Sequence, residues 1–186
     1  MKKELKLKLF GPPKVVFNQK DIRFSFSKME ALLYYLAVMG QVNRDEIAGI
    51  LWGAKENQVA RKNLRNTVYQ ANKIFEGDII VSPNRSSLAL NPDLSLSLDV
   101  QFFERDPLSA LDLYRGDFLE GFYVKDDEEF DQWASRKRDA YRKLYVESCY
   151  QKIKKVGFGD PSIELLLHHL VELDEFEEKN YQLLME

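Results

Sequence analysis

Leucine and lysine alternate over residues 5–9, at the start of the chain. Alternation with a period of two is typical of a strand with one buried face. Two further short apolar runs, over residues 15–17 and 22–24, are separated by a polar turn. The pattern therefore predicts a small antiparallel sheet before the first helix.

The first predicted helix is apolar on almost every side. Nearly every residue from 29 to 39 is apolar, and Gly40 directly after them fits a C-cap. Ser27 and Glu30 have the spacing of a capping box, in which the serine side chain caps the first turn. We therefore expect a buried helix with Ser27 as its N-cap.

A short helix and a long helix are predicted next. Asn43 and Glu46 form a second capping box, and the short helix closes at residues 52–53, barely two turns later. The long helix covers residues 57–75, with Gly77 to stop it. The predicted order is thus three strands followed by three helices.

The helix at residues 57–75 has one apolar face and one cationic face. At 100° per residue its apolar residues fall on one side. The opposite side carries Lys62, Arg65, Asn66, Tyr69, Asn72 and Lys73, with Arg61 on one flank. A solvated helix face usually mixes charge signs, because opposite charges pair at i,i+4. In a chain of net charge −3, a face of one sign favours an anionic partner, with a solvated face as the alternative.

A β-hairpin is predicted directly after this helix. Residues 78–82 and 87–90 have the pattern of strands, and residues 83–86 that of a tight turn. Arg85 lies at the tip of the hairpin, either as an exposed turn residue without a role or as a contact to nucleic acid. Residues 94–100 alternate only weakly.

The predicted secondary structure changes near residues 105–107. After them it predicts helices alone, over residues 108–119, 126–157, 162–174 and 176–186. Acidic residues at positions 126–129 suit the N-terminus of the longest of these helices, because the helix dipole is positive there. The last helix is still periodic where the chain stops, so we expect a fragment of a longer protein.

Composition excludes several classes of protein. The 186 residues are 45% hydrophobic, enough core material for one large domain or two small ones and too much for a disordered chain. Cys149 is the single cysteine, which excludes a disulfide framework and a cysteine-based zinc site. The longest uncharged run is too short to span a bilayer, and no signal-peptide core follows the N-terminus. We expect a cytoplasmic protein without a membrane partner.

Charge is distributed unevenly along the chain. Residues 1–105 carry 16 Lys and Arg against 11 Asp and Glu, a net charge of +5. Residues 106–186 carry 11 against 19, a net charge of −8. Such asymmetry suggests different partners for the two parts, one of them polyanionic.

The sequence contains no common catalytic motif. It has no P-loop, no dinucleotide-binding glycine fingerprint, no Gly-x-Ser-x-Gly and no His-Glu-x-x-His. His168 and His169 lie in an apolar helix, with Glu164 and Glu172 as the nearest further ligands, and adjacent helix residues cannot face one point. We therefore expect no enzyme activity, no cofactor and no metal.

Several segments, in this order, resemble bacterial regulators of the antibiotic-regulatory-protein (SARP) type. They are Val-Asn-Arg-Asp-Glu-Ile at residues 42–47, Leu-Trp-Gly at 51–53, Ala-Arg-Lys-Asn-Leu at 60–64 through Val68, and Leu-Ala-Leu-Asn-Pro at 88–92, followed by Asp99, Val100 and Phe102. The start of the second domain of those regulators is similar to Leu-Tyr-Arg-Gly-Asp-Phe-Leu at 113–119 and to the helix with Trp133, Arg136, Arg142 and Leu144. The resemblance covers almost the whole chain.

The resemblance implies a fold of two parts. Residues 1–105 would form an OmpR-like winged helix, an α+β domain with an N-terminal antiparallel sheet, three helices and a C-terminal β-hairpin wing. Residues 106–186 would form an all-α, tetratricopeptide-like bacterial transcriptional activator domain, cut roughly in half. The implied function is to bind double-stranded DNA and activate bacterial promoters, with the second part supporting self-association or contact with RNA polymerase.

The winged-helix interpretation assigns roles to the cationic residues. The helix at residues 57–75 would enter the major groove, and the wing at residues 82–87 the adjacent minor groove. Narrow minor grooves attract arginine, so Arg85 would contact that groove or a phosphate. We expect base or groove contacts from Arg65, Asn66 and Tyr69, and phosphate contacts from Arg61, Lys62 and Lys73.

A non-catalytic interaction scaffold is the alternative function. In that case the winged helix has lost DNA binding, and the helical part holds a partner peptide. Trp133, Tyr141, Tyr145 and Tyr150 would line such a groove, although packing between helices is the commoner use of such aromatic residues.

Overall fold

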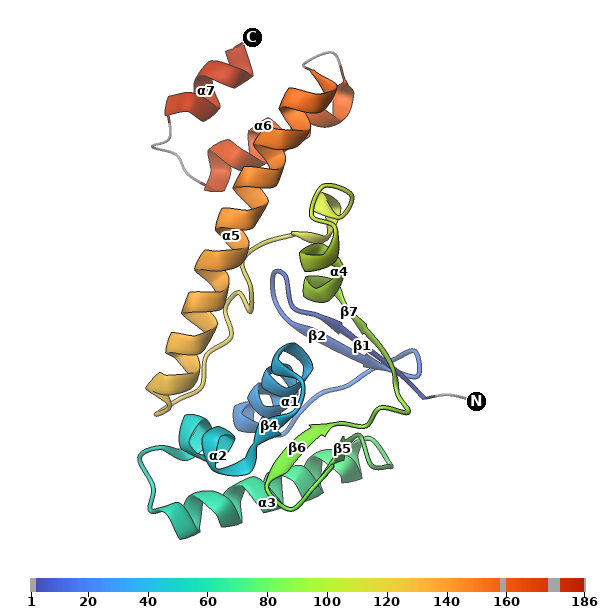
Figure 1. Cartoon of the computed structure of the whole chain (residues 1–186), viewed down its shortest axis with the longest axis vertical. Coiled ribbons are helices and arrows are strands. Elements are labelled where there is room, and N and C mark those ends of the chain that lie inside the picture. The colour runs from blue at the N-terminus through green and yellow to red at the C-terminus, as the bar shows by residue number, and fades with distance from the viewer. Residues whose placement is uncertain (1–2, 158–159, 174–177, 186) are drawn as a thin grey trace.

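The computed structural model describes residues 3–157, 160–173 and 178–185, which fold into an α+β structure. A four-stranded sheet lies in the middle of the molecule (Figure 1). The first three helices and a second, smaller sheet lie below it in this view, and the remaining helices lie above and beside it. The longest helix, α5, runs from the neighbourhood of α2 to the far end of the molecule.

The elements follow one another in an order close to the predicted one. They are β1 (Glu4–Lys8), β2 (Lys14–Phe17), β3 (Lys20–Asp21), α1 (Ser27–Met39), β4 (Val42–Asn43), α2 (Arg44–Trp52), α3 (Asn57–Ile74), β5 (Ile80–Val81), β6 (Ser87–Leu90), β7 (Ser95–Leu98), α4 (Asp99–Arg105), the short 3-10 helix η1 (Leu111–Leu113), α5 (Glu128–Val156), α6 (Pro161–Leu173) and α7 (Glu178–Met185).

The larger sheet is mixed rather than purely antiparallel. Its order is β3-β2-β1-β7, with β1 antiparallel to β2 and parallel to β7. The prediction of an antiparallel sheet was incomplete, because β7 joins from more than 80 residues away in the sequence. The prediction of a strand at residues 22–24 was also wrong, because the third strand, β3, ends at Asp21. Asn18 and Gln19 turn the chain with positive φ angles of 47° and 67°, so pairing resumes at once in β3.

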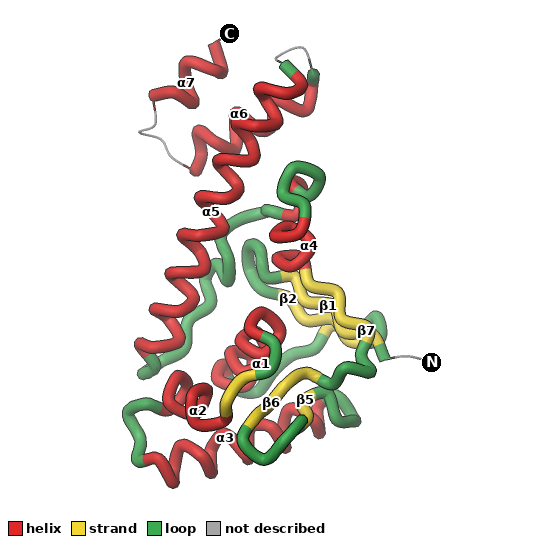
Figure 2. Tube along the Cα trace, viewed as in Figure 1, coloured by secondary structure: helices red, strands yellow, loops and turns green. Residues whose placement is uncertain are grey.

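The smaller sheet carries the predicted hairpin. β5 and β6 pair antiparallel, with Ile80 opposite Leu90, and the two-residue β4 pairs with the other edge of β6 (Figure 2). The strand at residues 78–82 is shorter than predicted, and β4 was not predicted, since two residues show no alternation. The hairpin is therefore fastened to the start of α2 as well as to the end of α3.

The predicted helix caps are confirmed in two of three cases. Asn43 Oδ1 accepts a hydrogen bond of 2.8 Å from the backbone N–H of Asp45, and Gly40 ends α1 with a φ of 76°. The prediction that Ser27 is the N-cap of α1 was wrong. Phe26 holds the extended N-cap position without a side-chain cap bond, and Ser27 is already in the first turn.

The predicted helix over residues 108–119 was wrong. Residues 99–105 form α4 instead, and the segment after Pro107 contains only the short helix η1. The reason is a competing interaction, because Phe118 forms a β-bridge with Phe10 and the Leu119 N–H donates to the Leu9 carbonyl over 2.8 Å. Pairing with the end of β1 thus replaces helical hydrogen bonds in this segment.

One hydrophobic cluster runs through the molecule. The ring of Phe10, after β1, packs against Phe103, Tyr114 and Tyr141, with centroid distances of 5.3, 4.9 and 5.3 Å. The predicted domain boundary between residues 105 and 106 lies inside this cluster, and the division into two domains stays a prediction.

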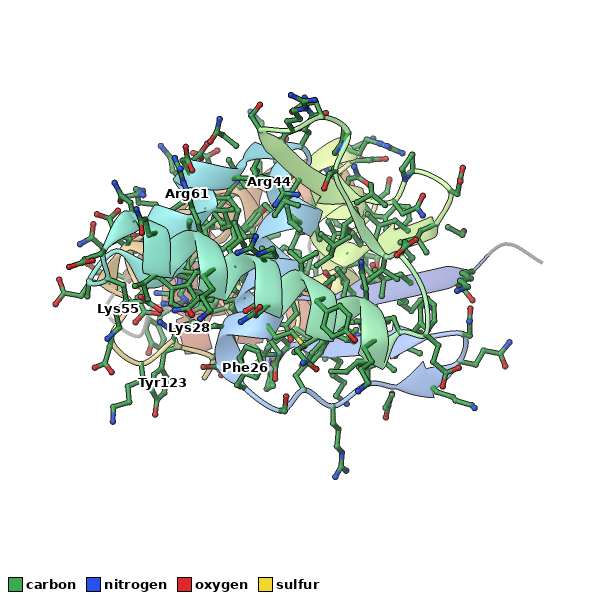
Figure 3. All side chains as sticks on the ribbon, turned by 90° about the horizontal axis from the view of Figure 1, so that it is seen from below. Phe26, Lys28, Arg44, Lys55, Arg61 and Tyr123 are labelled. Carbon is green, nitrogen blue, oxygen red and sulfur yellow. The ribbon has the colours of Figure 1, made fainter. Side chains whose placement is uncertain are left out.

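Lys28 connects three helices. Its ammonium lies 2.5 Å from Asp127 at the start of α5, and donates over 2.8 Å to the Leu51 carbonyl near the end of α2. The same group lies 5.5 Å from the centre of the Trp52 ring. The start of α5 is therefore fixed to α1 and α2 (Figure 3, Lys28).

The aromatic residues of α5 belong to the core. Trp133, Tyr141 and Tyr145 are buried, and the Tyr145 hydroxyl lies 2.8 Å from His169 Nδ1 on α6. These three residues therefore do not line an open groove. Of the predicted last helix, residues 176–177 and 186 lie outside the described residues, and α7 begins at Glu178. None of the helices, over the described residues, has an apolar stretch long enough to cross a membrane.

Asp99, the first residue of α4, is a buried carboxylate with four partners. It accepts backbone hydrogen bonds from Leu9, Phe10 and Val100 at 2.8 to 3.2 Å, and Arg115 lies 3.4 Å away. Burial raises the pKa of Asp99, and these donors oppose the rise. The carboxylate thereby joins the end of β1 to the start of α4.

Replacing Asp99 is expected to destabilise the whole fold. Asp99→Ala leaves buried N–H groups without acceptors and should lower the free energy of unfolding by about 2–4 kcal/mol. Asp99→Asn keeps one acceptor oxygen and should lower the free energy of unfolding by less than Asp99→Ala does. Urea unfolding monitored by fluorescence measures both, with exposed Asp93→Ala as the control that stays at the parent value.

Acid is expected to weaken the contact between α5 and α6. Burial lowers the pKa of His169, so the folded protein binds a proton less readily than the unfolded chain. Stability is then complete above the unfolded pKa of about 6.5 and is lost as the pH falls below it. Thermal unfolding between about pH 7.5 and about pH 5.5 should show a smaller pH dependence in His169→Asn. Exposed His168→Asn is the matched control, and an equal change in both variants would contradict the assignment.

Candidate nucleic-acid interface

α3 is fixed in the fold by small and apolar residues at helical spacing. Ala60, Leu64, Thr67 and Ala71 are buried, and the helix packs against α2 and α1. No acidic residue occurs within Asn57–Ile74. The face opposite the buried residues is therefore presented outward with cationic and neutral polar side chains (Figure 3).

The structure places all seven predicted contact residues on the surface. On α3 the exposed ones are Arg61, Lys62, Arg65, Asn66, Tyr69 and Lys73, and Arg85 is exposed in the turn between β5 and β6. Tyr69 has 65% of its surface accessible, which is unusual for so large an aromatic residue.

Four of these residues meet in one open groove of about 760 Å³. Arg61, Lys62 and Arg65 line it from α3, and Arg85 lines it from the hairpin turn. Asn66, Tyr69 and Lys73 lie on the outward face of α3 outside this groove. The groove thus joins the helix and the hairpin into one cationic surface.

Arg61 is already paired. Its Nε and Nη2 donate to the Asp45 carboxylate over 2.7 and 2.8 Å, and both side chains are largely exposed. The hydrogen bonds and the charge of Asp45 raise the pKa of Arg61 above its ordinary value. α3 itself has cations alone, but α2 contributes an acid to the same surface, which the pattern of α3 could not show.

Asn72 was wrongly placed on the outward face. Its Oδ1 accepts from the N–H groups of Ile79 and Ile80 over 3.1 and 2.9 Å, and its Nδ2 donates to the Ile80 carbonyl over 2.9 Å. The chain turns back directly after α3, which brings the β5 backbone within reach of this side chain. Asn72 therefore fixes the hairpin to the helix.

Arg44 was missed by sequence reasoning. This first residue of α2 lines the groove, its side chain bonds Ser82, and its backbone N–H donates to the Ser86 carbonyl over 2.8 Å. Figure 3 shows Arg44 and Arg61 along the same edge of α3. The short strand β4 brings Arg44 to the hairpin, and the sequence gives no signal for it.

The turn that carries Arg85 is stabilised by its own side chains. Asn84 Oδ1 accepts hydrogen bonds from the N–H and the hydroxyl of Ser86, over 2.9 and 3.0 Å. The two bonds span Arg85, so this residue is held at the tip of a defined turn.

Carboxylates and histidines elsewhere do not assemble a metal site within the described part of the chain. In those residues no group of three His, Cys, Asp or Glu side chains is arranged to hold a metal ion. Asp127, in the acidic run before α5, pairs with Lys28, and His169 bonds Tyr145.

Removal of the Asn72 side chain is expected to loosen the hairpin. Asn72→Ala removes the side-chain acceptor of the Ile80 N–H and leaves the Ile79 N–H with the Gly77 carbonyl alone, so the free energy of unfolding should fall by about 1–3 kcal/mol. Hydrogen exchange should accelerate most at Ile80. Gln70→Ala, on the exposed face of the same helix, should change neither quantity, and unchanged exchange in Asn72→Ala would contradict this role.

Comparison with known proteins gives a similarity of fold. No family model and no curated protein matches the chain. Among solved structures, it is similar to EmbR of Mycobacterium tuberculosis, determined in complex with a low-affinity phosphopeptide, with a TM-score of 0.64 and 16% sequence identity. The match covers 98% of this chain and 54% of that chain, so this chain spans about half the length of that protein. The similarity supports a SARP-like fold.

Proposed function

We propose that this protein is a sequence-specific transcriptional regulator that binds double-stranded DNA. The observation that carries the proposal is the cationic surface on which Lys62 and Arg65 of α3 meet Arg85 of the hairpin. Phosphate contacts to such cations supply most of the affinity of DNA-binding proteins. The SARP-like fold supports the same function.

In this proposal residues 1–105 form a winged-helix domain, and α3 is its recognition helix. Its 18 residues make about five turns, long enough to lie along a major groove that is wide enough for a helix. Arg65, Asn66 and Tyr69 then contact bases or the groove, and Lys62 and Lys73 contact phosphates. Arg61 contacts a phosphate through the nitrogen that Asp45 does not engage.

The hairpin turn at residues 82–87 is the wing. Arg85 projects from it and enters the adjacent minor groove, where narrow segments concentrate negative potential. Asn72 and the Arg44 backbone hold the hairpin relative to α3. The spacing between the two groove contacts is therefore fixed before DNA binds, which lowers the cost of ordering on association.

Residues 106–186 act in protein contacts rather than on DNA in this proposal. Their net charge of −8 repels phosphates. As the resemblance to SARP-type regulators implies, this helical, tetratricopeptide-like part supports self-association or contact with RNA polymerase and makes the protein an activator. EmbR was determined in complex with a phosphopeptide, and a peptide partner of that protein is in keeping with a protein partner for this chain.

The decisive experiment selects bound sequences from random duplexes and then measures affinity for the selected duplex by fluorescence anisotropy. Lys62→Ala, which removes a phosphate contact, should weaken binding to all sequences and reduce the slope of log affinity against log salt by about one. Arg65→Ala should cost about 1–3 kcal/mol and relax the preference at one base pair.

Two variants serve as controls for this experiment. Lys155→Ala removes an exposed cation in the last turn of α5, at the other end of the molecule from α3 (Figure 1), and should leave binding unchanged. Asp45→Asn removes the acid on the cationic surface and should strengthen binding. Absence of duplex binding by the parent protein at low salt would overturn the proposal in favour of a protein-interaction scaffold.

A further inference from the structure

A second group of cations lies at the turn between β1 and β2, at the other end of the sheet from α3 (Figure 1). It surrounds a small cavity of about 250 Å³. The lining consists of Lys8, Phe10, Gly11, Pro12, Lys14 and Arg115, and none of the described carboxylates contributes to it. Three cations therefore share one small cavity.

The two lysines face each other across the strands. Lys8 of β1 and Lys14 of β2 are direct partners in the antiparallel register, so their side chains leave the same face of the sheet. Like charges in this position destabilise a sheet. Neither ammonium has a hydrogen-bond or ion-pair partner among residues 3–157, 160–173 and 178–185.

Arg115 is fixed beside the lysines by the backbone. The Gly11 N–H donates to the Asp117 carbonyl over 2.9 Å, and the Glu120 N–H donates to the Gly11 carbonyl over 3.2 Å. These bonds hold the segment after Tyr114 against the β1–β2 turn. Gly11 has a φ of 78°, a conformation that favours glycine, so the turn has no side chain at this point of the cavity.

Two of the neighbouring carboxylates, Asp99 and Asp117, are engaged in other contacts. Asp99 accepts three backbone hydrogen bonds and lies 3.4 Å from Arg115, and Asp117 pairs with Arg142 and Tyr114. The Glu120 carboxylate lies beside Gly116 and is not among the groups that line the cavity. The positive charge of Lys8 and Lys14 thus has no compensating acid in the cavity.

We propose that this cavity binds a phosphate group, either as free orthophosphate or as the phosphoryl group of a small phosphomonoester. A phosphate dianion accepts charge-assisted hydrogen bonds from both lysines and from the guanidinium of Arg115. It converts the repulsion between Lys8 and Lys14 into attraction to a shared ligand. The site lies apart from α3 and does not depend on DNA binding.

The test is a titration of the full chain with orthophosphate, followed by two-dimensional amide NMR at ionic strength held constant with chloride. The amides of Gly11 and Arg115 should shift and saturate. Lys8→Gln and Lys14→Gln should each weaken binding by about tenfold, the loss of one charge-assisted contact. Lys6→Gln is the matched control, because Lys6 lies on the same face of β1 but outside the cavity.

A second measurement tests the repulsion between the ammonium groups of Lys8 and Lys14. Without phosphate, Lys14→Gln should raise the thermal midpoint at low ionic strength, and Lys6→Gln should not. Titration with sulfate and with glycerol 2-phosphate separates a general oxyanion site from one selective for phosphomonoesters.

Three results would overturn the proposal. They are the absence of saturation in the parent protein, equal weakening by Lys6→Gln, and a duplex DNA that shifts Gly11 and Arg115 as strongly as the amides of α3. The last result would make these cations part of a nucleic-acid surface.

Discussion

The buried carboxylate of Asp99 is the interaction on which the arrangement of the two halves depends. It ends β1 by accepting the N–H groups of Leu9 and Phe10, and it begins α4 by accepting that of Val100. Phe10 can then enter the core between Phe103, Tyr114 and Tyr141, which come from the part of the chain beyond the sheet. A polar group in a low-dielectric interior thus positions Phe10 within this group of aromatic rings.

Local patterns predicted the elements that local forces determine. The alternation in β1, the cap at Asn43 and the two faces of α3 follow from neighbouring residues, and the structure contains all three. The helix predicted over residues 108–119 was wrong because Phe118 and Leu119 pair with the distant end of β1. The hydrophobic periodicity of a segment carries no information about a strand that pairs with it from a distant part of the chain.

In the candidate site too, features set by neighbouring residues were predicted and contacts between distant segments were not. Apart from Asn72, the sequence predicted the exposed side chains of the cationic face of α3, since exposure follows from helical spacing. It could not predict that Asp45 engages Arg61, that Asn72 binds the β5 backbone, or that Arg44 lines the groove. These contacts depend on how α2, α3 and the hairpin approach one another, and hence on packing among distant segments.

The parallel pairing of β1 with β7 has a consequence for how the chain folds during its synthesis. Leu5 lies beside Leu96, so the central strand of the larger sheet acquires its second neighbour only after more than 90 residues have left the ribosome. Closing so long a loop is entropically costly, and contacts of high sequence separation slow folding. A β1–β2 hairpin that forms before β7 has been synthesised has one open strand edge, and open edges of this kind are prone to aggregation.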